Sequence, residues 1–212
     1  MQILILAAGD NERWWGRVPK QLVQIEGKPL IRRTVEQVIE RAEPVVITHN
    51  PAIQAAVPYF AGPEASRYIT ETLLSTAYLW QGRTIILLGD VIYSDETIKA
   101  IFANRKPVAV FGRKWEIFAV AFNKQMSKKV IKALELAIAN GEAGGRAKLW
   151  EFYHAYCEMS LTEVHYLEDK IFVPVEDYTD DIDTLEQYGD FLQANSWAGS
   201  KSMSDIVREY GL

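Results

Sequence analysis

The chain has 212 residues, 49% of them hydrophobic and 24% charged, so it can bury a full hydrophobic core, and its length favours a single domain over residues 1–212. The formal net charge of −5 excludes a global basic field, so we expect no nucleic-acid partner and expect any anionic ligand to be held by local cations. Cys157 is the only cysteine, which excludes an internal disulfide and a cysteine-rich zinc site.

Targeting and membrane signals are weak in this sequence. The apolar run at positions 3–8 is shorter than the core of a signal peptide and follows no cationic leader. No apolar stretch approaches the ~20 residues that a membrane-spanning helix needs. We therefore expect a cytoplasmic protein with no membrane partner, and the single cysteine fits that reducing compartment.

Short apolar runs alternate with longer helical patterns through the first two-thirds of the chain. The predicted strands are Gln2–Leu6, Pro44–Thr48, Tyr68–Ile69, Thr84–Leu88 and Pro107–Phe111. The predicted helices are Leu30–Arg41, Pro51–Ala56, Glu71–Trp80 and Asp95–Ala103. Two of the strands are continuous apolar runs, which are typical of a parallel sheet buried on both faces. The alternation predicts right-handed βαβ units.

The last third of the chain departs from this alternation. Glu116–Phe122 follows a Gly112-Arg113 turn, so we expect it to run antiparallel to the strand before it. The further predicted elements are a helix Met126–Ala139 that stops at Asn140-Gly141, a helix Lys148–Met159, a strand Lys170–Val173, an acidic segment Glu176–Asp183 and a helical tail over residues 184–212. The sequence thus predicts one Rossmann-like, three-layer α/β/α domain with a mixed, mainly parallel sheet.

The segment after the first predicted strand has the residues of a phosphate site. Small residues, Ala7-Ala8-Gly9, let backbone N–H groups approach a ligand, and the cations Arg13 and Lys20 can neutralise phosphate oxygens. The segment lacks the G-x-G-x-x-G fingerprint of a dinucleotide site and the G-K-[ST] of a P-loop. These features predict a nucleoside triphosphate site.

Two acidic motifs accompany this loop. Gly89-Asp90 ends a predicted buried strand, which puts a carboxylate at the sheet edge where α/β proteins bind ligands, although Gly-Asp also forms ordinary turns. Asp181 and Asp183 are two residues apart and would share one face of an extended segment. Either a cation lies between them, or they form an acidic flank for a helix that begins near Thr184.

In order and spacing, these residues resemble the GT-A nucleotidyltransferases, whose opening signature is L-A-A-G-x-G-x-R-(M/L)-G…P-K-x-L…G-K-P-(L/M). The matching residues are Leu6-Ala7-Ala8-Gly9, Arg13, Gly16, Pro19-Lys20, Leu22 and Gly27-Lys28-Pro29-Leu30. Asn11 stands where the family has a glycine, and Trp14-Trp15 replaces a short aliphatic residue, so these rings either cover the triphosphate or anchor the loop. The acidic segment resembles the family motif D-x-D-T-P-E-D, with Leu185 in place of proline and Gln187 in place of the last acid.

The resemblance implies transfer of a nucleoside monophosphate from a nucleoside triphosphate to a small phosphorylated acceptor, with release of pyrophosphate. It implies Mg²⁺ held by Asp90 and Asp183 with Asp181 as a helper, Lys20 near the α-phosphate and Arg13 on the β- and γ-phosphates. The implied nucleotide site consists of Leu6, Ala7, Ala8, Gly9, Asp10, Asn11, Arg13, Lys20 and Thr76. Thr76 serves either as such a contact or only as a helix hydroxyl.

Two other functions share parts of this pattern. A GT-A glycosyltransferase uses an acidic pair but lacks the Arg13…Lys20 signature, and a non-catalytic nucleotide-binding domain would keep the fold without turnover. The shared motifs do not select an acceptor, because family members act on sugar 1-phosphates, phosphocholine and molybdopterin alike. Arg146, Lys148 and Lys170 either bind an acceptor phosphate or lie on a solvated face.

Overall fold

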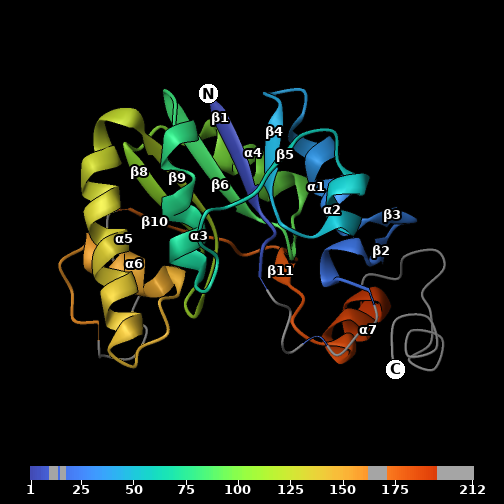
Figure 1. The fold of residues 1–212 in the computed structure, drawn as a ribbon. Helices are drawn as coiled ribbons and strands as arrows, with labels where there is room; N and C mark the ends of the chain where they lie inside the picture. The colour runs from blue at the N-terminus through green and yellow to red at the C-terminus, as the bar shows by residue number, and fades with distance from the viewer. Residues whose placement is uncertain (10–13, 15–17, 162–170, 195–212) are drawn as a thin grey trace.

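A seven-stranded mixed sheet forms the centre of the molecule (Figure 1). The computed structural model describes residues 1–9, 14, 18–161 and 171–194. The strand order is β10 (Phe172–Pro174), β8 (Val108–Arg113), β9 (Glu116–Asn123), β6 (Arg83–Leu88), β1 (Gln2–Leu6), β4 (Pro44–Ile47) and β5 (Phe60–Ala61). β9 alone runs antiparallel to its two neighbours, and the other neighbouring pairs are parallel. The mixed, mainly parallel sheet is as predicted.

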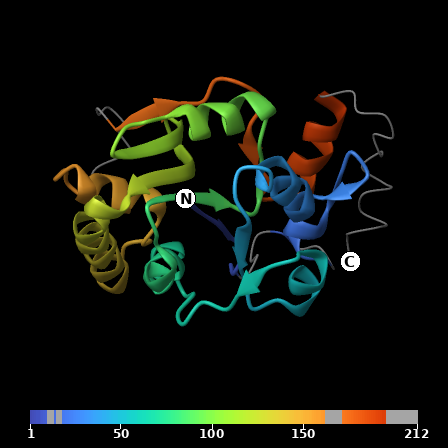
Figure 2. The same cartoon turned by 90° about the horizontal axis from the view of Figure 1, so that it is seen from above.

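Helices cover both faces of this sheet, because successive side chains of each strand point to opposite faces. In β1, Ile3 and Ile5 pack with α1 (Leu30–Val38), α2 (Pro51–Ala56) and α4 (Asp95–Ala103). Leu4 and Leu6 belong to a second core with α3 (Ile69–Ser75), α5 (Ser127–Glu142) and α6 (Leu149–Tyr156). In Figure 2, α4 and α5 lie on opposite sides of the sheet. The three-layer α/β/α prediction is confirmed.

A third, smaller core beside the sheet joins the opening segment of the chain to its last described helix. The hairpin of β2 (Gln24–Ile25) and β3 (Lys28–Pro29) packs with Trp14 and with α7 (Leu185–Ala194). The Tyr188 hydroxyl donates to the backbone oxygen of Gln24 at 2.7 Å. A two-stranded ribbon of β7 (Val91–Ile92) and β11 (Asp180–Asp181) lies next to this core. These contacts tie the C-terminal acidic segment to the opening segment of the chain.

Most predicted elements are confirmed. β1, α2 and α4 have the predicted bounds, and Ser94 caps α4 because its hydroxyl accepts a hydrogen bond from the Thr97 N–H at 2.9 Å. The helix predicted over Glu71–Trp80 is divided into α3 and a 3₁₀ turn, Ala77–Leu79. α7 confirms the start of the predicted helical tail, whereas Lys170 and residues 195–212 lie outside the described residues.

The strand predicted at Tyr68–Ile69 is wrong, because these residues begin α3. Tyr68 is the extended N-cap residue, and its N–H donates to Glu71 Oε2 at 3.2 Å. A glutamate three residues into a helix commonly satisfies the cap N–H in this way. The strand of this region is β5, whose two residues are too few to show a sequence pattern.

The stop predicted at Asn140-Gly141 is also wrong. α5 continues to Glu142, and Gly141 is buried inside it. A larger residue would not fit there, because an added Cβ would lie 2.7 Å from the Cβ of Ala147. The chain turns at Gly144, whose φ of +104° suits glycine. The first glycine therefore serves packing, and the later one permits the turn.

No helix in the described part of the chain is both long enough and apolar enough to cross a membrane.

Replacing Gly89 with alanine should lower the free energy of unfolding by about 1–3 kcal/mol. An added Cβ would lie 2.9 Å from the backbone oxygen of Leu6 and 3.0 Å from the Cβ of Ala7, so the end of β6 must shift. Urea denaturation measures the effect. The matched control is Gly62→Ala, whose Cβ would meet only His49 at 3.6 Å. Equal stability of Gly89→Ala and wild type would contradict the close packing at this strand end.

Candidate functional site

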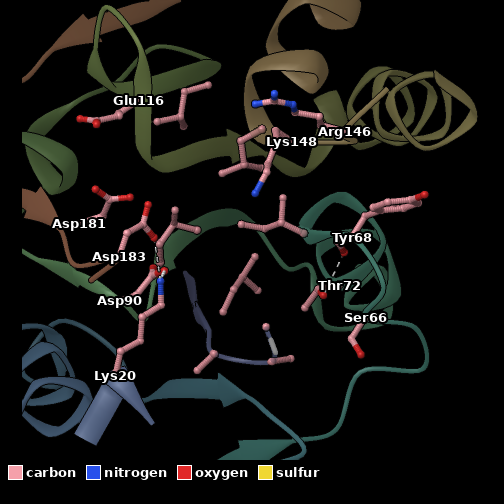
Figure 3. Close-up of a pocket in the computed structure, with 18 of the residues that line it drawn as sticks. Lys20, Ser66, Tyr68, Thr72, Asp90, Glu116, Arg146, Lys148, Asp181 and Asp183 are labelled. Atoms are coloured by element: carbon pink, nitrogen blue, oxygen red, sulfur yellow. Dashed lines mark hydrogen bonds and ion pairs between the residues drawn. The ribbon is translucent and has the colours of Figure 1, made fainter. Parts of the chain in front are cut away.

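A cavity of about 590 Å³ lies at the carboxyl ends of β1 and β6 (Figure 3). This is the edge at which open α/β sheets bind ligands, and the volume is in the range of small-molecule sites. The lining residues come from the segment after β1, from the end of β6, from β9, from α3 and the loop before α6, and from the acidic segment; the charged ones are Lys20, Arg67, Asp90, Glu116, Arg146, Lys148, Asp181 and Asp183.

Backbone pairing brings Asp90 and Asp183 together from distant parts of the sequence. β7 begins directly after Asp90, and its Val91 lies opposite Asp181 in the antiparallel ribbon with β11. The Ile182 N–H then donates to the backbone oxygen of Asp90 at 3.0 Å. Asp183 is therefore the next residue after a direct backbone contact with Asp90, and both carboxylates line the cavity.

Lys20 joins these two carboxylates. Its Nζ lies 2.6 Å from Asp90 Oδ2 and 3.1 Å from Asp183 Oδ1 (Figure 3). Burial acts to lower the pKa of Lys20, but the charges and hydrogen bonds of Asp90 and Asp183 outweigh it and raise the pKa. The ammonium group therefore stays charged and neutralises part of a carboxylate cluster that faces the cavity.

A second carboxylate cluster adjoins the first. One carboxylate oxygen each from Glu116, Asp180 and Asp181 lies within 4.8 Å of the others, a grouping that can hold a metal ion. Burial and the neighbouring charges of Asp183, Asp90 and Glu116 raise the pKa of Asp181 to about 7. Burial and the charge of Asp180 likewise raise the pKa of Glu116. The cavity edge therefore concentrates negative charge.

Glu116 was not predicted from the sequence as a site residue. It is the first residue of β9, which runs antiparallel, so it lies at the same edge as the carboxyl ends of the parallel strands. The signal was present in the sequence, because an antiparallel strand begins where its parallel neighbours end. A carboxylate at that position was thus a candidate.

A network of hydrogen bonds fixes the acidic segment. Asp177 accepts hydrogen bonds from the Ser94 hydroxyl, from Thr97 Oγ1 at 2.8 Å and from the Thr179 N–H at 2.8 Å. Burial acts to raise the pKa of Asp177, but these bonds outweigh it and lower the pKa. Arg113 donates to Asp180 Oδ2 at 3.1 Å and to the Asp177 backbone oxygen at 2.9 Å. The segment is therefore anchored to α4 and β8 before it reaches Asp181.

Asp183 lies at the start of α7, as the predicted acidic flank of a helix does. Besides contacting Lys20, it precedes α7, and Gln187 Oε1 accepts hydrogen bonds from the Asp183 and Thr184 N–H groups at 2.9 Å. The Thr184 hydroxyl in turn accepts a hydrogen bond from the Gln187 N–H at 3.2 Å. The glutamine that departs from the family motif thus caps the helix.

The other predicted nucleotide residues fall into three groups. Leu6, Ala7, Ala8 and Gly9 line the cavity, and Asp10, Asn11 and Arg13 lie outside the described residues. Thr76 does not line the cavity, because its buried hydroxyl donates to the Leu73 backbone oxygen at 2.7 Å and accepts from Trp80 Nε1 at 3.0 Å. The structure therefore brings Leu6–Gly9, but not Thr76, to the cavity.

Trp14 anchors the opening segment. Its ring is 2% exposed, its Nε1 donates to the Val18 backbone oxygen at 2.6 Å, and its ring centroid lies 6.3 Å from that of Tyr188 in an edge-to-face arrangement. These contacts support the anchoring role for Trp14, which also lines the cavity; Trp15 lies outside the described residues.

Comparison with known proteins identifies related domains. Residues 3–155 match the family model of the MobA-like NTP transferase domain. Comparison with curated protein sequences finds no match. Several solved structures share the fold over nearly the whole chain.

One similar structure is CTP:phosphocholine cytidylyltransferase from Streptococcus pneumoniae, which is 14% identical, covers 92% of this chain and 98% of its own, and gives a TM-score of 0.60. Another is a putative glucose-1-phosphate thymidylyltransferase from Bacillus anthracis, with 12% identity, coverage of 97% and 99% and a TM-score of 0.62. A third is the inositol-1-phosphate CTP transferase from T. maritima, with 10% identity, coverage of 100% and 98% and a TM-score of 0.60. At these identities the likeness establishes the fold.

Replacing Asp181 with asparagine in the metal-free protein should stabilise it increasingly as the pH rises from 4 to 8. The unfolded carboxyl ionises near pH 3.8, whereas the folded one keeps its proton until about pH 7, so ionisation costs stability across this window and the full cost applies above it. The gain at pH 8 is on the order of 1–4 kcal/mol. Chemical denaturation in EDTA at pH 4.5, 6 and 8 measures it, with the exposed Asp190→Asn as control. A gain independent of pH would contradict the carboxylate crowding.

Proposed function

The chain belongs to the MobA-like NTP transferase domain family, and from this premise we propose that it is a Mg²⁺-dependent nucleotidyltransferase. It transfers a nucleoside monophosphate from a nucleoside triphosphate to a small phosphorylated acceptor and releases pyrophosphate. The observation that carries the proposal is the contact of Lys20 with both Asp90 and Asp183 at the cavity edge. Lys20 can exchange the carboxylates for a phosphate, and the two carboxylates can exchange Lys20 for a metal ion.

The opening loop and Lys20 hold the triphosphate in this proposal. The segment Leu6–Gly9 lines the cavity, and an added Cβ at Gly9 would meet no atom of the described residues within 4 Å, so a ligand can approach the backbone closely. Lys20 reaches the same cavity from the 3₁₀ turn Lys20–Leu22. We assign Lys20 to the α-phosphate and Arg13 to the β- and γ-phosphates, with Asp10 and Asn11 completing the loop.

The carboxylates fit a hard divalent cation. Asp90 and Asp183 are partly exposed to the cavity, and Asp181 beside them has a raised pKa because negative charges crowd it. Mg²⁺ prefers a few carboxylate oxygens together with water and substrate phosphate. We assign it to Asp90 and Asp183 with Asp181 as a helper. When bound, the ion would neutralise charge that develops on the triphosphate.

The reaction requires the protein to position the two substrates and to stabilise negative charge. An oxygen of the acceptor phosphate attacks the α-phosphorus, the bond from that phosphorus to the oxygen bridging to the β-phosphate breaks, and the electron pair leaves with pyrophosphate. An ionised phosphate is already nucleophilic, so no side chain has to remove a proton. Lys20 and the opening loop align the anions and stabilise the transition state.

The acceptor class draws support from the solved structures. The three similar structures described above are named for the transfer of a nucleotide to a phosphorylated small molecule, namely phosphocholine, glucose 1-phosphate and inositol 1-phosphate. We place the reaction in the cytoplasm, which supplies nucleoside triphosphates and keeps a lone cysteine such as Cys157 reduced.

The direct test incubates the protein with each of the four ribonucleoside triphosphates, Mg²⁺ and a panel of phosphorylated acceptors, and measures pyrophosphate. Asp90→Ala and Asp183→Ala should each lower the turnover rate by about 10²–10³-fold, the usual cost of a lost charge-assisted contact in the transition state. The exposed Asp95→Ala should retain wild-type turnover. Full activity in either site variant would exclude that carboxylate from the site. Thermal stabilisation by nucleotide without pyrophosphate release would indicate a binding domain instead.

Replacing Lys20 with methionine should change metal binding and turnover in opposite directions. Without nucleotide, Mn²⁺ should bind several-fold more tightly, because the ammonium group that neutralises Asp90 and Asp183 is gone. Turnover should fall about 10²–10³-fold, because the α-phosphate loses its cation. Mn²⁺ titration followed by electron paramagnetic resonance measures the first effect, with Lys28→Met as control because that lysine pairs with Glu36 on the surface. Weaker Mn²⁺ binding by Lys20→Met would overturn the assignment.

A further inference from the structure

Two cations line the cavity opposite the Lys20 cluster. Arg146 and Lys148 come from the loop before α6, and Figure 3 shows the Lys148 amine directed into the cavity across from Asp90, Asp183 and Lys20. Within the described residues neither side chain has an ion-pair partner, whereas Lys20 contacts two carboxylates. Uncompensated positive charge on a cavity wall attracts an anion.

The loop that carries these cations is fixed by a buried carboxylate. Glu151 is 1% exposed. Its Oε1 accepts hydrogen bonds from Asn140 Nδ2 at 2.7 Å and from the Arg146 N–H at 3.0 Å, and its Oε2 accepts one from the Lys148 N–H at 2.6 Å. A buried carboxylate needs such partners to offset its lost hydration. Glu151 therefore holds the backbone of both cationic residues in one geometry.

Ala147, between the two cations, has an unusual backbone conformation. Its φ of +48° lies in the left-handed region, which is unfavourable for a residue with a Cβ. The residue is fully buried, and its carbonyl accepts a hydrogen bond from Thr70 Oγ1 at 2.9 Å. Strain of this kind persists only where the surroundings enforce it, and it is concentrated at ligand clamps.

Glycines at two positions let the loop approach its supports. An added Cβ at Gly145 would lie 2.3 Å from Asn140 Nδ2 and 2.9 Å from Glu151 Oε1, so only glycine fits beside the buried carboxylate. Gly141 likewise admits the methyl group of Ala147. The loop thus packs on α5 and α3, and its two cations line the cavity.

We propose that Arg146 and Lys148 form the subsite for the phosphate of the acceptor, and that Glu151 is the residue that positions them. The triphosphate already has Lys20 and the opening loop on the facing wall, so a second anion-binding wall serves a second anion. The reaction must bring two phosphate groups into contact, and Arg146 and Lys148 offset the repulsion between them. This assignment rests on the proposed function and names the class of ligand as a phosphomonoester.

Binding of inorganic phosphate tests the subsite without requiring turnover. Isothermal titration at constant ionic strength should show phosphate binding to wild type that weakens at least tenfold in Arg146→Gln and in Lys148→Gln. The control Lys132→Gln removes an exposed lysine of α5 that does not line the cavity, and it should bind as wild type does. Equal weakening in all three variants, or no weakening in the first two, would overturn the subsite. Both site residues are exposed, so their variants should fold.

Kinetics then separate the acceptor from the nucleotide. Arg146→Gln and Lys148→Gln should raise the KM for the acceptor at least tenfold and change the KM for the nucleotide less than twofold. The reverse pattern would make this wall a triphosphate site and overturn the proposal. If wild type releases no pyrophosphate with any acceptor, the proposed function fails, and the phosphate titration still decides whether the anion site exists.

Glu151→Gln tests the positioning role. It keeps the shape of the side chain but replaces one accepting oxygen with a donor, so it can no longer accept from Asn140, Arg146 and Lys148 together. The KM for the acceptor should rise about as much as in the cation variants, with the KM for the nucleotide unchanged. A loss shared equally by both substrates, or an unchanged acceptor KM in a folded variant, would show that Glu151 serves only the fold.

Discussion

The contact of one ammonium group with two carboxylates organises the functional edge of this protein. Lys20 comes from the opening segment, Asp90 from the end of β6, and Asp183 from a segment that returns after more than ninety further residues. Without the lysine, like charges from Asp90, Asp181 and Asp183 would face one another in a partly dehydrated cavity. The same crowding that makes the arrangement costly makes it ready to accept a metal ion and a phosphate.

Two kinds of support hold this arrangement in place. The parallel strands β1 and β6 lie side by side in the sheet, so Ala7–Gly9 and Asp90 lie at the same edge. The acidic segment is not part of the main sheet, and it is held instead by the β7–β11 ribbon, by Arg113 and by the hydrogen bonds of Asp177. On the opposite wall, Glu151 fixes a separate cationic loop. Polar contacts therefore fix the acidic segment and the cationic loop, which both lie outside the main sheet.

The sequence predicted those parts of the fold and site that depend on periodicity or on a strand end. Apolar runs indicated the parallel strands, and the Gly-Asp step placed Asp90 at the carboxyl edge. The ribbon of β7 and β11 was not predicted, because strands of two residues show no alternation. The roles of Asp177 and Glu151 were also missed, since their partners are set by long-range packing or by an unusual φ at Ala147. The two alternatives for Thr76 stayed open in the sequence, because the partners of its buried hydroxyl, Leu73 and Trp80, are set by the packing of the folded chain.

When the nucleotide and metal bind, the ammonium group of Lys20 should leave Asp90 and Asp183, and the metal ion should take its place. A crystal structure with Mn²⁺ and a non-hydrolysable nucleoside triphosphate analogue, with anomalous scattering to locate the metal, tests it most directly. The predicted result is Mn²⁺ on Asp90 and Asp183, with the Lys20 ammonium group moved from these carboxylates to the α-phosphate. Mn²⁺ on Glu116, Asp180 and Asp181, with Lys20 still bound to Asp90 and Asp183, would contradict the account.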